Sequence, residues 1–269
     1  MDIIQTSLFT DEELYELAEE RNQLVVKHNS LIQKTRYSLS TQQQKIILYL
    51  ISKIKPDDDE LKEYDFDIRD FCRVCGIETQ GKNYKNVKES ILQLHNKAFW
   101  IETEEVDTLV SWVQKAIIYK KDTRLRIRLD ETLKPFLLHL REQFTTYELS
   151  NILCMRSKHS IRLYEYLKSF LSIGKIRLSV DELKTLLDCH GKGYARWNNF
   201  RQMVIDKALQ EINDYSDLQI DIELEKCGRT IESVVFIIQK KDSYAASLTS
   251  LQNAARLNGT IYEKEKEKE

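Results

Sequence analysis

Glycine and proline are scarce in this sequence, with seven glycines and two prolines among 269 residues. Sandwiches and barrels built from many tight turns use more of both, so the scarcity favours a helix-rich fold. The sequence also lacks an apolar run near the ~20 residues that a membrane-spanning helix needs, and its first residues form no basic-then-apolar leader. We therefore expect a cytoplasmic protein that neither spans a membrane nor is secreted.

The five cysteines are scattered, and the five histidines form no pair at a metal-binding spacing. Cys72 and Cys75 are separated by two residues inside an expected helix. No second pair follows at the spacing of a zinc finger or ribbon, and a zinc site needs four ligands. We therefore expect packing thiols in a reducing compartment, no metal site and no cofactor.

The motifs of several enzyme classes are missing as well. The chain has no G-x-x-x-x-G-K-[ST] phosphate loop, no G-x-G-x-x-G after a strand and no H-E-x-x-H. A strand-nicking replication enzyme would need two histidines separated by one apolar residue, beside a catalytic tyrosine. Thirteen tyrosines are present but no such histidine pair. We expect no catalytic activity and keep a nicking enzyme as the alternative from a different class.

The net charge of −2 hides a strong local asymmetry. Residues 115–128 carry six basic residues and one acid, and basic residues also dominate 156–207. Acids gather in 11–20, 57–63 and 211–225. Because charges beyond a Debye length are screened, nucleic-acid binding depends on the local field and not on the net charge. The pattern predicts cationic contact faces and acidic far faces.

One series of elements is present twice, about 115 residues apart. The first copy has expected helices over 41–54, 68–75 and 83–94, and the second over 157–170, 180–189 and 197–212. Alternating strand patterns follow the last helix of each copy. Tyr49 corresponds to Tyr164 and Val87 to Val204. We predict an α+β, helix-rich fold of two tandem winged-helix domains related by internal duplication.

The same pattern suggests how the chain is divided. Residues 1–21 form an acidic arm with a helix capped by Thr10, and residues 22–130 form the first domain, which includes a strand over 109–119. Residues 131–241 form the second domain, which begins with a helix over 132–144. Residues 242–269 are charged, end in alternating glutamate and lysine, and are expected to be disordered.

The last helix of each copy suits the major groove, where amide and cationic side chains reach base edges in pairs of hydrogen bonds. In the second copy, Phe200, Val204, Ala208 and Ile212 form the inward stripe. The outward candidates there are Arg196, Asn198, Asn199, Arg201 and Gln202, and those of the first copy are Lys82, Lys85 and Asn86. Either face alone is equally consistent with a solvated helix surface. Their recurrence in a repeat favours DNA binding.

Three further groups are candidate phosphate contacts. Arg156, Ser157 and Lys158 precede a helix and could hold a phosphate at its start, or merely cap it. Lys192 lies in a basic turn. Arg124 and Arg126 alternate with apolar residues on an expected wing strand, where they could contact DNA or pair with acids of their own domain.

The residues Ser160–Leu167, Val180–Lys184 and Phe200–Asn213 resemble the iteron-binding plasmid replication initiators. In that family an R-L-Y-E helix precedes an E-L helix and then a long helix ending in A-x-x-E-I-N. Val26–Leu31 and Leu39–Gln43 also look like the first domain of that family. The resemblance spans roughly 22–240 in the same order and is most specific in the second half.

The resemblance implies paired winged-helix domains that bind double-stranded DNA at origin repeats without catalysis. The second domain would be the main reader, with base contacts from Arg196, Asn199 and Gln202 and phosphate contacts from Arg156, Lys158 and Lys192. The first would contact the next turn and support a homodimer that represses its own synthesis at an inverted operator, with the monomer active at the origin. Host initiator and replicative helicase are the implied partners. The alternative within binding proteins is a tandem winged-helix transcriptional regulator.

Overall fold

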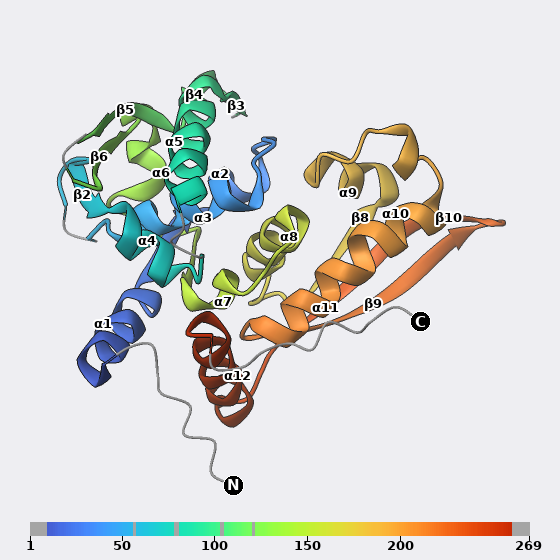
Figure 1. Ribbon diagram of the computed structural model, residues 1–269. Coiled ribbons are helices and arrows are strands. Elements are labelled where there is room, and N and C mark those ends of the chain that lie inside the picture. Colours follow the sequence, from blue (N-terminus) through green and yellow to red (C-terminus); the bar gives the residue numbers. More distant parts are fainter. Residues whose placement is uncertain (1–9, 56–57, 78–80, 103–104, 120–121, 260–269) are drawn as a thin grey trace, which may run out of the picture.

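The computed structural model describes residues 10–55, 58–77, 81–102, 105–119 and 122–259 (Figure 1). The N-terminal half contains α1 (Asp11–Arg21), β1 (Leu24–His28), α2 (Asn29–Gln33), α3 (Thr41–Ser52), β2 (Glu63–Asp67), α4 (Ile68–Val74), α5 (Gly81–Asn96), β3 (Ala98–Glu102), β4 (Asp107–Ser111), β5 (Val113–Ile118) and β6 (Arg124–Leu129). The rest contains η1 (Glu131–Leu133), α6 (Lys134–Leu137), β7 (Phe144–Glu148), α7 (Ser150–Leu153), α8 (Lys158–Lys168), β8 (Lys175–Ser179), α9 (Val180–Leu186), η2 (Lys192–Tyr194), α10 (Trp197–Phe200), η3 (Arg201–Ile205), α11 (Asp206–Tyr215), β9 (Leu218–Cys227), β10 (Thr230–Lys240) and α12 (Ser243–Leu257).

Both halves contain the predicted winged-helix unit. The first unit runs α3, β2, α4, α5, β5, β6, and its sheet has the order β2-β6-β5. The second runs α8, β8, α9, α10–α11, β9, β10, and its sheet has the order β8-β10-β9. In each sheet the strand between the first two helices pairs with the last strand, which pairs with its hairpin partner. All these pairings are antiparallel.

Equivalent residues of the two units occupy equivalent core positions. Tyr49 and Tyr164 are 3% and 0% exposed, and Val87 and Val204 are 0% and 1% exposed. Burying large apolar side chains at the same place in both copies is what two packed three-helix cores require. The correspondence derived from the sequence therefore also holds in the packing.

Predicted caps fix where the helices start. The side chains of Thr10, Ser40 and Ser179 each accept a hydrogen bond from the backbone amide of the third helical residue. The side chain of that third residue in turn accepts a hydrogen bond from the backbone amide of the cap residue. Such capping boxes satisfy two amides that the first helical turn otherwise leaves open. Ser157 caps α8 in the simpler way, accepting from the amide of His159. These contacts fix the starts of α1, α3, α8 and α9.

The expected single strand over 109–119 is divided at Trp112. The indole is 1% exposed and packs on Phe99 and Tyr37, with ring centroids 4.7 and 5.1 Å away. Burying this ring ends the ladder with β3 and begins the one with β6. The result is a separate two-stranded hairpin, β3–β4, beside the winged-helix sheet.

The expected helix over 132–144 is wrong beyond residue 137. His139 and Gln143 adopt positive φ angles of 52° and 53°, which interrupts a helix. Phe144–Glu148 is instead β7, paired antiparallel with β1 from the start of the first unit. Pairing with a strand distant in sequence overrides local helix propensity here. The two units are thereby joined by a small sheet.

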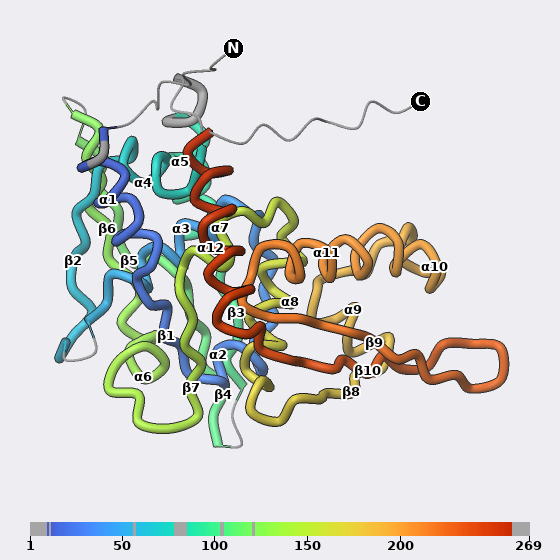
Figure 2. The backbone as a smooth tube through the Cα atoms, turned by 90° about the horizontal axis from the view of Figure 1, so that it is seen from below, coloured from blue at the N-terminus to red at the C-terminus, as the bar shows by residue number. Residues whose placement is uncertain are grey.

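The segment after Lys241 corrects another expectation. Instead of a disordered tail, Ser243–Leu257 forms α12, capped by Asp242. This helix lies beside α7 in both views (Figures 1 and 2). At its end, Arg21 donates to Asn258 over 2.8 Å. The described part of this segment therefore connects the second unit to the N-terminal part of the chain. Residues 260–269 lie outside the described residues.

Candidate nucleic-acid interface

The third helix of the second unit runs without a break from Trp197 to Tyr215, with a π-helical turn over Arg201–Ile205. Phe200, Val204, Ala208 and Ile212 are each at most 1% exposed, as the predicted stripe requires. The wider π turn also buries the adjacent Ile205. Such turns occur often at functional sites, where they change which residues face outward.

The outward face of this helix is polar. Asn198, Asn199 and Gln202 are exposed, and Met203 beside them is 59% exposed. Amide side chains can form bidentate hydrogen bonds with adenine in the major groove. Arg201 differs from these because it is half-buried and its Nε lies 3.1 Å from Asp206. It is the one candidate on this helix that already has an acidic partner.

The segment before the helix presents cations to solvent. Lys192 begins the short helix η2 and Arg196 is the residue before α10, and both are exposed. Lys184 of α9 holds this segment in place, with its Nζ 3.4 Å from the carbonyl of Ala195 and 5.8 Å from the Phe200 ring centroid. Both candidates therefore flank the start of the helix, where phosphates bind favourably.

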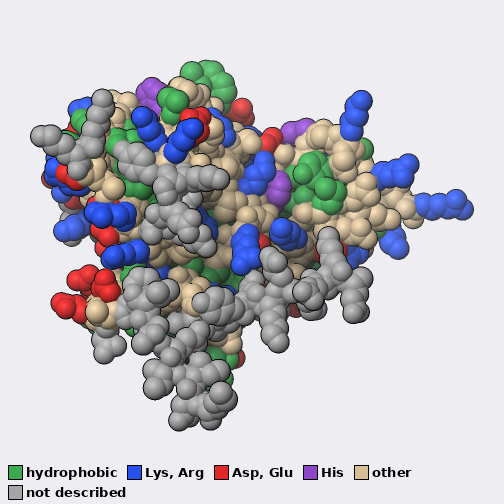
Figure 3. Space-filling view, viewed as in Figure 1, with side chains coloured by type: hydrophobic (Ala, Val, Ile, Leu, Met, Phe, Trp, Pro, Cys, Tyr) green, Lys and Arg blue, Asp and Glu red, His purple; other side chains and the backbone are tan. Residues whose placement is uncertain are grey.

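The wing of the second unit is a candidate contact surface that the sequence reasoning did not assign. β9 and β10 form a long hairpin that turns at Gly228, whose φ of 61° suits glycine. Lys226 and Arg229 at this tip are exposed. Figure 3 shows Lys and Arg side chains projecting at the end of the molecule where Figure 1 places the hairpin. The sequence feature that could have identified this surface is the basic turn Lys226–Arg229.

The third helix of the first unit is α5. Val87, Ile91 and Leu94 of this helix are buried, and the outward candidates Lys85 and Asn86 are exposed, as predicted for these two. The side chain of Lys82 lies outside the described residues. α5 and α10–α11 are on the near side in Figure 1 and lie toward the same side in Figure 2. One duplex could therefore meet both helices.

The wing arginines of the first unit are paired with acids. Arg126 makes two hydrogen bonds with Asp65 across the β2–β6 ladder, at 2.8 and 2.9 Å. These bonds raise the pKa of Arg126 and lower that of Asp65. Arg124 lies 2.8 Å from Asp122. The alternative in which these cations serve their own domain fits this geometry better than DNA contact.

At the start of α8 a carboxylate occupies the expected phosphate position. Glu211 of α11 accepts hydrogen bonds from the amides of Arg156 and Ser157, at 3.3 and 3.1 Å. Lys158 lies 3.4 Å from Asp188. The backbone amides that were expected to bind a phosphate therefore already donate to Glu211, although the Arg156 side chain is exposed. Ser157 instead caps α8, which is the alternative that the sequence also allowed.

The Arg162–Glu165 motif, which carries much of the resemblance, faces the first unit. Glu165 accepts from Lys27 of β1 and from the hydroxyl of Tyr147 of β7, each at 2.7 Å. The side chains of Lys27 and Glu165 are 1% and 2% exposed. A buried ion pair must be well hydrogen-bonded to offset its desolvation, and here the hydroxyl supplies the extra bond.

The other polar residues of the motif also make structural contacts. Arg162 donates to the carbonyl of Thr35 at 2.8 Å, and its guanidinium lies 4.5 Å from the ring centroid of Tyr37. Tyr164 donates to Asp217, after the third helix, at 2.9 Å. The motif therefore joins the two units and the segment that follows α11. Its role is positioning, which no local pattern in the sequence reveals.

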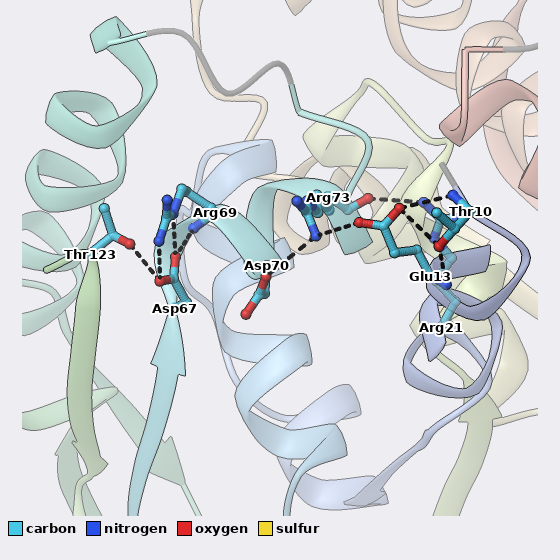
Figure 4. Close-up of polar contacts among 8 residues, drawn as sticks. All are labelled: Thr10, Glu13, Arg21, Asp67, Arg69, Asp70, Arg73 and Thr123. Atoms are coloured by element: carbon cyan, nitrogen blue, oxygen red, sulfur yellow. Dashed lines mark hydrogen bonds and ion pairs between the residues drawn. The ribbon is translucent and has the colours of Figure 1, made fainter. Parts of the chain in front are cut away.

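An acidic surface lies over α1 and the neighbouring part of the first unit (Figure 3). Arg73 of α4 is 3.7 Å from Glu13 of α1 and 4.0 Å from Asp70, while Asp67 accepts from Thr123 (Figure 4). A groove of about 500 Å³ between α1 and the first unit is lined by several carboxylates. Asp and Glu side chains gather over α1 in Figure 3. Its carboxylates disfavour contact with a phosphate backbone, and residues 11–20 in this surface are one of the acidic runs of the sequence.

Two structural properties bear on other classes of function. Within the described residues, no three His, Cys, Asp or Glu side chains are grouped so as to hold a metal ion. Also within these residues, no helix is long and apolar enough to cross a membrane.

Two family models match the chain, and the first of them extends through α8. The model described as "Initiator Replication protein, WH1" matches residues 24–168, and "Initiator Rep protein, WH2" matches residues 179–238. A "Replication initiation protein" of Escherichia coli is 23% identical in an alignment of 250 residues that covers 88% of this chain and 77% of that protein. An "Uncharacterized 27.6 kDa protein" of Escherichia coli is 22% identical over 227 residues, covering 78% of this chain and 93% of the other.

Among solved structures, the RctB domains 2–3 resemble this chain with a TM-score of 0.46 and 14% identity, over 80% of this chain and 88% of that one. Such a likeness is weak, and the family models carry the assignment. Three observations point to the same family. The chain folds into two winged-helix units, the third helix of the second unit has an exposed amide row (Asn198, Asn199 and Gln202), and family models match most of the chain. The protein belongs to the initiator replication protein family and is a DNA-binding plasmid replication initiator with paired winged-helix domains.

Proposed function

We propose that the protein initiates plasmid replication by binding short direct repeats at the origin, with the α10–α11 helix in the major groove. Arg196, Asn199 and Gln202 read base edges, and Lys192 contacts a phosphate. The exposed amide row on a helix whose opposite face is fully buried carries this proposal, because a rigid helix fixes the side chains that must match base edges. Asn198, the third exposed amide of the row, adds to the polar surface.

We further propose that the first unit contacts the next turn of the same duplex through α5. Lys85 and Asn86 are the described residues available for this, and Lys82 belongs to the same segment. Their position on the side of the molecule that also presents α10–α11 supports contact with one continuous duplex. Arg156 and Lys158 lie between the units in the chain and would add backbone contacts there.

In this proposal the protein acts by binding and not by catalysis, in the cytoplasm. The monomer is the form active at the origin, and a homodimer through the first domain represses synthesis at an inverted operator. Melted origin DNA is then passed to the host initiator and the replicative helicase. A nicking activity is tested by incubating supercoiled origin plasmid with the protein and Mg²⁺ or Mn²⁺; relaxed product would contradict the proposal.

The proposal is tested with duplexes taken from direct repeats beside the gene. Asn199→Ala and Gln202→Ala should each weaken binding to the repeat while leaving binding to an unrelated duplex unchanged, because base contacts carry sequence preference. Gln252→Ala, an exposed amide on α12, is the matched control and should bind as the wild type does. Equal affinity of all three variants for the repeat would refute the base-reading role of α10–α11.

A further inference from the structure

Met203 is an apolar side chain on the polar face of the α10–α11 helix. It is 59% exposed, whereas Phe200 and Val204 on the opposite face are at most 1% exposed. The exposed amides Asn199 and Gln202 lie on the same side of the helix as Met203, since residues three and four apart are neighbours on a helix surface. An isolated exposed apolar side chain is ordinary, but this one lies within the row of side chains that face the DNA in the proposed function.

The π-helical turn accounts for the outward position of Met203. Met203 follows Phe200 by three residues, and in a regular α-helix two side chains at that spacing share a face. Here Phe200 is fully buried and Met203 is exposed. The wider turn over Arg201–Ile205 brings Val204 and Ile205 inward together and leaves Gln202 and Met203 outward together. The backbone therefore departs from a regular helix where it presents this apolar side chain.

The surroundings of Met203 suit a DNA groove. Asp206, an acid on the same stretch of helix, lies 3.1 Å from the guanidinium of Arg201, and Lys207 is exposed. The helix is on the near side of the molecule in Figure 1. Among the groups that base pairs present in the major groove, the 5-methyl group of thymine is apolar. A thioether side chain is flexible and polarizable, so it can adapt to such a small apolar surface.

We propose that Met203 is a specificity-determining residue that packs on the 5-methyl group of a thymine in the repeat. The inference rests on the proposed base reading by α10–α11 and adds the identity of one base. The neighbouring Gln202 has the amide that forms paired hydrogen bonds with adenine, the partner of thymine. Gln202 and Met203 together therefore select A·T at one base pair or at two adjacent ones.

Replacing the thymines of the cognate repeat one at a time with deoxyuridine tests the proposal, because the 5-methyl group is removed and the hydrogen-bonding groups stay. Fluorescence anisotropy should show that the wild type binds about three- to five-fold more weakly after one of these replacements, the effect of burying one methyl group. Met203→Ala should bind the natural repeat more weakly and no longer distinguish thymine from deoxyuridine at that position.

Two further variants serve as controls. Met203→Leu keeps an apolar side chain and should retain part of the preference for thymine over deoxyuridine. Leu251→Ala removes another exposed apolar side chain, on α12, where it is 69% exposed. This variant should respond to every deoxyuridine as the wild type does.

Failure of this inference can be distinguished from failure of the proposed base reading. If Asn199→Ala loses preference for the repeat while Met203→Ala responds to every deoxyuridine as the wild type does, the helix reads bases but Met203 contacts no methyl group. An equal loss of affinity of Met203→Ala for the repeat and for an unrelated duplex would also refute the inference. If neither Asn199→Ala nor Met203→Ala differs from the wild type on the repeat, both proposals are wrong.

Discussion

The arginines that the sequence suggests as DNA contacts differ in whether they already pair with an acid of the protein. Arg196 is exposed at the start of the α10–α11 helix, and its side chain makes no capping hydrogen bond there. Arg126 is held by both oxygens of Asp65. A cation that already has a bidentate acid must give up that pair to bind a phosphate, so exposure alone does not make a DNA contact.

This difference gives a paired prediction. Arg196→Ala should weaken binding to the cognate repeat by about 1–3 kcal/mol and relax base preference at one position. Arg126→Ala should change affinity by less than about two-fold, since its charge is already neutralised by an exposed ion pair. Fluorescence anisotropy with cognate and substituted duplexes measures both. A larger effect from Arg126 than from Arg196 would reverse the two roles.

A second prediction concerns acid. Burial lowers the pKa of His159 and of His28 below the ordinary value of 6.5, with Lys158 and Lys34 adding to the effect. As the pH falls below about 7, the unfolded chain takes up these protons first, so stability should fall until the lowered folded pKa values are reached. Urea unfolding midpoints between pH 7.5 and 5.5 measure this. His159→Gln should flatten the dependence; an unchanged slope would exclude His159 as a cause.

The inward stripes of α5 and α10–α11 could be predicted from sequence because helical periodicity alone determines which side is buried. The acidic partners of Arg126 and Lys27 could not be predicted, because they are distant in sequence. Asp65 stands opposite Arg126 only because of the register between β2 and β6. Such registers are set by tertiary packing, and one residue of slip would change every pair.

At the scale of elements, the interface between the two units, here called the seam, is formed largely by contacts of α8. Its residues reach β1, β7 and the segment after α2, while α3 donates from Gln44 to the carbonyl of Lys158 at 2.9 Å. The sequence predicted α8 and its cap but not this use of them. β7 was not predicted either: the expected helix over 132–144 ended at its first residue, and the local sequence does not reveal the pairing with β1.

The buried pair at this seam can be tested by substitution. Glu165→Gln leaves the Lys27 ammonium buried without its acid and should destabilise the protein by about 3–5 kcal/mol. Lys27→Met combined with Glu165→Leu removes both charges and should recover much of that loss, because hydrophobic replacement of a buried pair is often neutral or stabilising. Equilibrium urea unfolding is the measurement. Wild-type stability of Glu165→Gln would show that the pair does not hold the seam.

At the scale of the whole molecule, α12 connects parts that are distant in sequence. Leu257 packs so closely on Gly76 that a Cβ there would lie 2.6 Å from its Cδ2, and Gly76 also has a φ of 62°. Arg21 bonds both Asn258 and the carbonyl of Val74. This end of α12 therefore fixes the acidic arm, the first unit and the second unit to one another.

Truncation tests this role. A chain ending at Lys241 should unfold at a lower temperature than the full protein and be cleaved faster by protease at the seam, since the contacts of α12 are lost. A chain ending at Gly259 keeps α12 and removes the alternating Glu and Lys residues, and should match the full protein in both measurements. If the two truncated chains behave alike, α12 contributes nothing to the seam.

The central claim is that both winged-helix units contact successive turns of one duplex, and hydroxyl-radical footprinting on a single direct repeat tests it most directly. The wild type should protect two backbone patches on one face of the DNA, about one helical turn of 10–10.5 base pairs apart. Asn199→Ala should weaken the patch of the second unit and Lys85→Ala that of the first. A single patch, lost with Asn199→Ala and unaffected by Lys85→Ala, would contradict the claim.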